Sequence, residues 1–124
     1  MRTLDLVVPV YNEAEVLPEL HGRLTAVARE LPYDWRIIYV DDGSDDGTPG
    51  LLRDYARESP RVAVITLSRN FGQQPAIAAG LAAAAADGVV LLDGDLQDPP
   101  ELIPDLCRSW ESGCDVVYAV KQKR

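Results

Sequence analysis

The chain opens with the stretch Leu4-Asp5-Leu6-Val7-Val8-Pro9-Val10, which runs directly into Tyr11-Asn12-Glu13. In this stretch most apolar residues stand next to one another instead of alternating with polar ones. A strand of this kind is expected to be buried on both faces, as in a parallel sheet covered by helices. Four more short runs rich in β-branched residues follow, at Arg36–Val40, Val62–Leu67, Val89–Leu92 and Val116–Val120.

Segments of helical length separate these runs, at Glu13–Glu30, Pro49–Glu58, Gln73–Ala86 and Glu101–Ser112. Strands that alternate with helices predict an α/β fold. Because crossovers between parallel strands are right-handed, we expect an open, mostly parallel, doubly wound sheet with helices on both faces. The 124 residues fit one domain, residues 1–124, in which only the strand-helix unit repeats.

Local signals place the helix boundaries and one close contact. Asp45, Asp46 and Thr48 are suited to cap the second helix, with Pro49 in its first turn. Pro100 suits the opening of the fourth helix. The third helix is rich in alanine, with Gly80 in its middle, and this composition either reflects helix propensity alone or also lets the helix lie close against the sheet.

Composition excludes several classes of protein. Asp and Glu total 20 against 12 Lys and Arg, a net charge of −8, which argues against nucleic-acid binding. Cys107 and Cys114 are expected to be reduced thiols, and His21, the single histidine, is expected at the surface or as a cap. A signal peptide and a transmembrane helix are not expected, so the predicted compartment is the cytoplasm.

Polar residues concentrate after the strands, where open α/β sheets bind ligands. After the fourth strand, Asp93 and Asp95 flank Gly94, which permits the turn that lets two carboxylates converge on one cation. Gln97 offers a third oxygen. Ligand oxygens of this kind suit Mg²⁺ or Mn²⁺ shared with substrate phosphates. The sequence therefore predicts a metal site here.

The segments after the first three strands leave alternatives open. Asp41 and Asp42 can accept hydrogen bonds from a base or ribose, whereas the following residues 43–48 are expected to form a turn and cap. Tyr11 can stack on a base that Glu13 binds, or Asn12 can instead cap the first helix with Glu13 in its first turn. After the third strand, Arg69 either meets a phosphate or is a solvated surface residue.

Together these segments resemble family 2 glycosyltransferases of the GT-A fold, and within them the polyprenyl-phosphate group that includes dolichyl-phosphate mannosyltransferase and bactoprenol glucosyltransferase. Four segments carry the resemblance: Val8-Pro9-Val10-Tyr11-Asn12-Glu13, Val40-Asp41-Asp42-Gly43-Ser44, Leu67-Ser68-Arg69-Asn70-Phe71-Gly72 and Asp93-Gly94-Asp95-Leu96-Gln97-Asp98-Pro99-Pro100-Glu101. They occur in the family's order and span nearly the whole chain. The last two point to the lipid-phosphate group.

The resemblance implies an enzyme that transfers a hexose from a UDP-sugar or GDP-sugar donor to a polyprenyl phosphate, with inversion and with Mg²⁺ or Mn²⁺. The implied contacts to the base and ribose of the donor are Pro9, Tyr11, Glu13, Val40 and Asp42. The implied contacts to its diphosphate are Asp93, Gly94 and Asp95, and the implied metal ligands are Asp93, Asp95 and Gln97.

In two respects the chain departs from the family pattern. Lys121 stands where relatives often carry an arginine toward the diphosphate, and it keeps the charge without the bidentate fork. The catalytic base and any membrane association, at the cytoplasmic membrane face, are expected from sequence downstream of Arg124. The alternatives are a non-catalytic nucleotide-sugar-binding fragment and a nucleotidyltransferase. A nucleotidyltransferase is expected to carry a glycine-rich basic loop after the first strand, where this chain has Tyr11-Asn12-Glu13.

Overall fold

A computed structural model describes residues 2–92 and 99–111. Its sheet has the strand order β3-β2-β1-β4, and every pair of neighbouring strands is parallel. The strands are β1 Thr3–Val10, β2 Asp34–Asp41, β3 Val62–Thr66 and β4 Gly88–Leu91. The helices are α1 Leu17–Arg29, α2 Thr48–Glu58, α3 Gln73–Ala83, a short 3₁₀ helix η1 Pro100–Leu102 and α4 Ile103–Glu111. The fifth predicted strand, Val116–Val120, lies outside the described residues.

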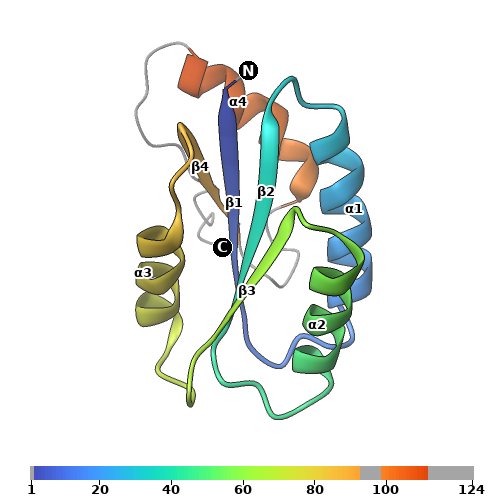
Figure 1. Ribbon diagram of the computed structural model, residues 1–124, viewed down its shortest axis with the longest axis vertical. Coiled ribbons are helices and arrows are strands. Elements are labelled where there is room, and N and C mark those ends of the chain that lie inside the picture. Colours follow the sequence, from blue (N-terminus) through green and yellow to red (C-terminus); the bar gives the residue numbers. More distant parts are fainter. Residues whose placement is uncertain (1, 93–98, 112–124) are drawn as a thin grey trace, which may run out of the picture.

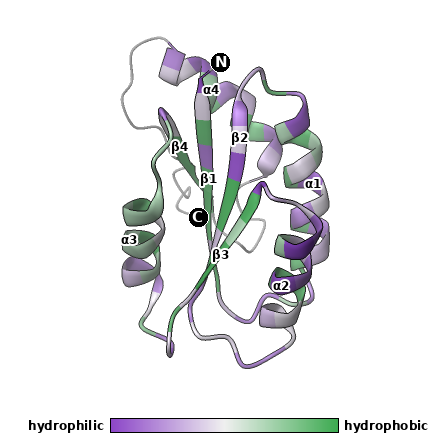
Figure 2. Cartoon of the chain, viewed as in Figure 1, coloured by the Kyte–Doolittle hydropathy of each residue, from purple (hydrophilic) through white to green (hydrophobic). Residues whose placement is uncertain are grey.

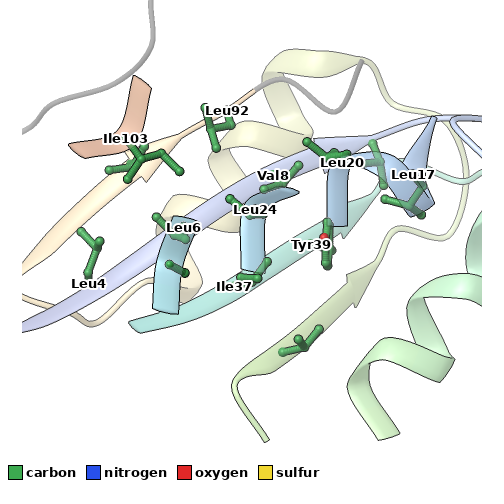
Figure 3. Packing of buried hydrophobic residues seen from close by; sticks show 14 of the residues in the cluster. Leu4, Leu6, Val8, Leu17, Leu20, Leu24, Ile37, Tyr39, Leu92 and Ile103 are labelled. Atoms are coloured by element: carbon green, nitrogen blue, oxygen red, sulfur yellow. The ribbon is translucent and has the colours of Figure 1, made fainter. Parts of the chain in front are cut away.

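Helices cover both faces of the sheet, as predicted (Figure 1). The larger core lies on the face of α1, α2 and α4, where alternate strand residues such as Leu6 and Tyr39 meet Leu20 and Leu24 of α1 (Figure 3). Ile103 joins this core from the start of α4. The smaller core on the other face contains Val7, Ile38, Val40 and Ala76, beneath α3. Because neighbouring strand residues enter different cores, both faces of β1 and β2 are buried, which is why their apolar runs do not alternate.

The close approach of α3 to the sheet is confirmed. Gly80 is buried, and a Cβ at this position would lie 2.5 Å from Cγ1 of Val7 and 3.0 Å from Cγ2 of Val40. Those distances leave no room for a methyl group beside β1. The absence of a side chain therefore sets the spacing between α3 and the sheet.

Three predicted helix boundaries were wrong, two because of hydrogen bonds from elsewhere in the chain and one because of a local 3₁₀ turn. The first helix begins at Leu17 and not at Glu13, since the amides of residues 13 and 14 bond side chains of the β2–α2 loop. The third helix ends at Ala83 and not at Ala86, since the amides of residues 85 and 86 donate to the Asp5 carboxylate. The fourth begins at Ile103 and not at Glu101, with Pro100 opening the preceding 3₁₀ turn as its proline geometry favours.

His21 is not a surface or capping residue. Its half-buried ring stacks on Tyr55 of α2, with 3.8 Å between ring centroids and 3° between planes, and its Nδ1 lies 2.6 Å from the hydroxyl of buried Tyr39. Burial lowers the pKa of His21. Cys107 is a free, buried thiol, as expected, and burial raises its pKa to about 11, whereas Cys114 lies outside the described residues.

None of the helices among the described residues is both long enough and apolar enough to cross a bilayer.

Candidate nucleotide-sugar site at the carboxyl edge of the sheet

The loops that follow β1, β2 and β3 gather at one edge of the sheet, at the bottom of the view in Figure 1. Parallel strands force this arrangement, because their carboxyl ends all lie on the same side. Polar residues dominate these loops, whereas the strands leading into them are mostly apolar (Figure 2). The β1–α1 loop contains Tyr11 to Val16, the β2–α2 loop Asp42 to Gly47, and the β3–α3 loop Leu67 to Gly72.

Side chains of the β2–α2 loop and of the first residue of α2 hold the β1–α1 loop by its backbone. The amide of Asn12 donates to Oγ of Ser44 at 2.9 Å, and the amide of Glu13 donates to Oγ1 of Thr48 at 3.0 Å. The amide of Ala14 donates to Asp46 at 3.3 Å. In return, Oδ1 of Asn12 accepts the amide of Asp45 at 3.0 Å. The two loops are therefore joined by four hydrogen bonds.

Asp46 links the β1–α1 loop to the start of α2. It also accepts the Thr48 amide at 2.9 Å. The N-cap of α2 is Gly47, which makes no side-chain cap bond, and this corrects the predicted capping by Asp45, Asp46 or Thr48. Asp46 is exposed, and although desolvation opposes its ionisation, the hydrogen bonds from Thr48 and Ala14 outweigh this and hold the pKa of Asp46 below its ordinary value. The ionised carboxylate thus binds the amide of Ala14 in the β1–α1 loop and the amide of Thr48 at the start of α2.

Asn12 does not cap α1, which corrects one of the two interpretations left open by the sequence. The helix begins at Leu17, and no side chain caps its first turn. Instead, Asn12 has a φ of 50° and directs its side chain across to the β2–α2 loop. Asparagine tolerates this left-handed conformation better than most residues with a side chain.

Asp42 is almost fully buried and holds the β3–α3 loop. Its two carboxylate oxygens accept the amides of Phe71 at 2.8 Å and of Gly72 at 3.0 Å. Gly43, with a φ of 74°, packs against the same loop, because a Cβ there would lie 2.3 Å from the carbonyl carbon of Arg69. The predicted contact of Asp42 with a donor remains a prediction. In the structure its carboxylate binds the backbone of the β3–α3 loop.

Asp41 is also buried, with 1% of its surface exposed, and its Oδ1 accepts the Ser44 amide at 3.0 Å. Its Oδ2 has no hydrogen-bond partner among the described residues. The carboxylate lies on the face of α1 and α2, because Tyr39 points to that face two residues earlier. Asp41 therefore supports the loop that holds Asn12 and is shielded from solvent.

The other described residues expected at the site fall into two groups. Pro9 and Val40 are paired across β1 and β2 and are buried, with Val40 against Gly80 of α3. Tyr11 is 42% exposed, and Glu13 is half-buried where the loop turns toward α1. The structure therefore presents Tyr11 and Glu13 at the edge, while the side chains of Pro9 and Val40 lie beneath them.

Arg69 and Phe71 lie in the β3–α3 loop at this edge and contact each other. The Arg69 guanidinium lies 4.7 Å from the centroid of the Phe71 ring, and Phe71 is 45% exposed. A guanidinium stacked on an aromatic ring keeps its remaining donors directed outward. The phosphate contact proposed for Arg69 therefore stays a prediction, with the side chain placed at the site.

The predicted diphosphate and metal residues Asp93, Gly94, Asp95, Gln97 and Lys121 lie outside the described residues. The chain reaches this segment from the same edge, because Leu92 follows β4 and its amide donates to the Val7 carbonyl at 3.0 Å. Within residues 2–92 and 99–111, no group of three or more His, Cys, Asp or Glu side chains is arranged to hold a metal ion.

Ser44, Asp46 and Thr48 are the residues whose part at this edge the sequence did not reveal. A turn and cap account for their composition, and Asp46 does bind the first amide of α2, although Gly47 is the N-cap. Their bonds to Asn12, Glu13 and Ala14 join residues 32 to 35 positions apart, a separation that no local pattern encodes. One sequence feature could have indicated these bonds. Asn12 and Ser44 are polar residues in loops that follow two neighbouring parallel strands.

Comparison with known proteins identifies relatives along the whole chain. Residues 5–124 match the profile of Glycosyl transferase family 2. The chain is 48% identical over 122 residues to undecaprenyl-phosphate 4-deoxy-4-formamido-L-arabinose transferase of Pseudomonas fluorescens, covering 98% of this chain and 36% of that protein. It is 40% identical over 121 residues to bactoprenol glucosyl transferase of Shigella phage SfV, covering 98% and 39%. The chain thus spans little more than a third of the length of these relatives.

Solved structures agree with the fold. Mannosyltransferase PcManGT from Pyrobaculum calidifontis, in complex with GDP-Man and Mn²⁺, superposes with a TM-score of 0.63 at 28% identity, over 74% of this chain and 27% of that one. S. aureus TarS in complex with UDP-GlcNAc gives a TM-score of 0.71 at 23% identity, over 90% and 32%. These likenesses confirm the expected GT-A fold, and with the profile match they show that the chain belongs to glycosyl transferase family 2.

Proposed function

We propose that the protein transfers a hexose from a nucleoside-diphosphate sugar to a polyprenyl phosphate, and that residues 1–124 form its donor-binding part. In this reaction an oxygen of the acceptor phosphate attacks the anomeric carbon, the bond from that carbon to the nucleoside diphosphate breaks, and the configuration inverts. The catalytic base is expected downstream of Arg124. A lipid acceptor would put the reaction at the cytoplasmic face of a membrane.

One observation carries the proposal: the carboxyl edge of the sheet presents Tyr11 and Glu13 on a loop held by four hydrogen bonds. Tyr11 is exposed enough to stack on a base, and Glu13 beside it offers a carboxylate to base or ribose N–H and O–H donors. Asp42, Pro9 and Val40 would support or contact the same part of the donor.

The diphosphate would lie toward Asp93, Gly94 and Asp95, which follow β4 in the sequence. Asp93, Asp95 and Gln97 are oxygen ligands suited to Mg²⁺ or Mn²⁺, and such a cation, when bound, would neutralise the leaving diphosphate. Lys121 and Arg69 would add positive charge. The names of the relatives that act on undecaprenyl phosphate and bactoprenol support the acceptor, and PcManGT with GDP-Man and Mn²⁺ supports the donor class and the metal.

The edge geometry disfavours a nucleotidyltransferase that cradles phosphates in the loop after β1. Such a cradle needs free backbone amides. The amides of residues 12, 13 and 14 are already donated to Ser44, Thr48 and Asp46. That loop is therefore better suited to present side chains than to bind phosphate.

Calorimetric titration of the chain with UDP, GDP, UDP-glucose and GDP-mannose, with and without Mn²⁺, tests the proposal. We expect metal-dependent binding of one nucleotide series, weakened at least about tenfold by Asp95→Asn, as for loss of a charged ligand. Asp54→Asn on α2, whose exposed carboxylate pairs with Arg57, is the matched control. Binding that ignores both Mn²⁺ and Asp95, or no binding at all, would contradict the proposal.

A further inference from the structure

Asn12 is the point at which the edge loop reverses. Among the described residues, Asn12 is the one non-glycine residue with a positive φ, which is 50°. This conformation separates exposed Tyr11 from half-buried Glu13, the two side chains that the proposed function directs at the donor. The direction in which each one leaves the backbone therefore depends on the left-handed turn at Asn12.

The side chain of Asn12 holds that turn against the β2–α2 loop. Its Oδ1 accepts the amide of Asp45, and its own amide donates to Ser44, so the residue is fixed from both its backbone and its side chain. Ser44 in turn is fixed by buried Asp41. The chain of contacts thus runs from the end of β2, through Ser44, to the loop that carries Tyr11.

Support of α1 does not account for these contacts. That helix starts five residues after Asn12, and its N-terminal turn has no side-chain cap. The hydrogen bonds that join Asn12 to Ser44 and Asp45 instead hold the conformation of residues 11–13. Binding sites gain affinity when such a loop is held in its bound conformation before the ligand arrives.

We propose that Asn12 is a positioning residue of the donor site, which fixes Tyr11 and Glu13 in the conformation that receives the nucleotide. This inference rests on the proposed function. Asn12 itself does not touch the donor and acts through its neighbours, with Ser44 as its immediate support.

The test measures nucleotide affinity by calorimetry and melting temperature in parallel, with UDP and GDP and saturating Mn²⁺. Asn12→Ala loses both the acceptor oxygen and the tolerance for positive φ, and we expect Kd to rise about tenfold. Ser44→Ala should raise Kd in the same direction but less. Asn12→Asp keeps the acceptor and the tolerance for positive φ, so it should restore most of the affinity.

Thr3→Ala is the control, because the Thr3 hydroxyl accepts the Asp87 amide at the opposite edge, a bond of the same kind at 2.9 Å. It should lower the melting temperature by a similar amount and leave Kd unchanged. Unchanged affinity in Asn12→Ala, or an equal loss in Thr3→Ala, would overturn the positioning role while wild-type binding stands. Absence of nucleotide binding by the wild-type chain would instead overturn the proposed function, and this inference with it.

Discussion

At the scale of single residues, a hydrogen bond between Tyr39 and His21 lies at the border of the larger core. Tyr39 is fully buried and its hydroxyl meets Nδ1 of His21 at 2.6 Å. Burial raises the pKa of Tyr39, so its hydroxyl stays protonated. In the neutral His21 tautomer that carries its proton on Nε2, Nδ1 accepts the hydrogen bond from this hydroxyl.

We expect this arrangement to make stability depend on pH between neutral and mildly acidic conditions. Because burial lowers the pKa of His21 below 6.5, the unfolded chain takes up its proton first as pH falls. The contribution of His21 to stability is therefore complete above that value and is lost progressively below it. Urea denaturation at neutral and mildly acidic pH should show a larger loss for the wild type than for His21→Gln. Equal losses in both proteins would contradict this assignment.

Gly43 is a second residue whose identity is fixed by its surroundings. Its φ of 74° disfavours any side chain, and a Cβ would collide with the backbone of Arg69 and Asn70. Gly43→Ala should lower the free energy of unfolding by about 2 kcal/mol or more, through left-handed strain plus displacement of the β3–α3 loop. Thermal denaturation measures the change. Gly47→Ala, whose Cβ meets only a side-chain methyl at 3.7 Å, is the control and should change it little.

At the scale of elements, the contact between α3 and β1 depends on the missing side chain at residue 80. Gly80→Ala gains helix propensity worth about 1 kcal/mol, but it places a methyl 2.5 Å from Val7. Overpacking costs about 1 to 3 kcal/mol, so we expect net destabilisation. Val7→Ala should relieve part of it, which denaturation of the double variant would reveal. Gly22→Ala in α1 has open space around it and should stabilise, so a stabilising Gly80→Ala would contradict the close packing.

Which elements form was predictable from sequence, because strand burial and helix length are local properties. The four strands of the described residues agree with the predicted runs to within two residues, and the run Arg36–Val40, for example, lies inside β2. Helix ends were less predictable. The start of α1 is set by Thr48 and the end of α3 by Asp5, and both bonds cross from one element to another. For the same reason Tyr11 and Asp42 were recognisable as edge residues, but their hydrogen-bond partners were not.

At the scale of the whole molecule, α3 differs from the other helices in having no charged face. Residues 70–86 contain no Asp, Glu, Lys or Arg, and Leu81 on α3 is 43% exposed. In Figure 2 most of α3 beyond its first turn is coloured apolar, whereas α1 and α2 contain several hydrophilic residues. A helix without a polar side is normally covered.

We therefore expect the isolated chain to associate with itself through the outer surface of α3. Sedimentation velocity should show a mean mass that rises with concentration. Leu81→Glu should reduce this rise without changing the melting temperature, because the side chain is exposed. Arg53→Glu on α2 provides a charge change elsewhere on the surface. A wild-type chain that sediments as a monomer at every concentration would rule this out.

The strand order also bears on how the protein is made. β1 is synthesised before the other described strands, yet it lies between β2 and β4, and its start is tied to Asp87 by hydrogen bonds that span 84 residues. While a ribosome is still producing α2 and α3, one edge of β1 has no strand to pair with. Long-range pairing of this kind slows folding and leaves apolar strand edges open to other chains. The nascent chain is thus most vulnerable to misassembly until β4 emerges, and substitutions that weaken β4 should reduce the yield of folded protein in cells more than they reduce the stability of the finished molecule.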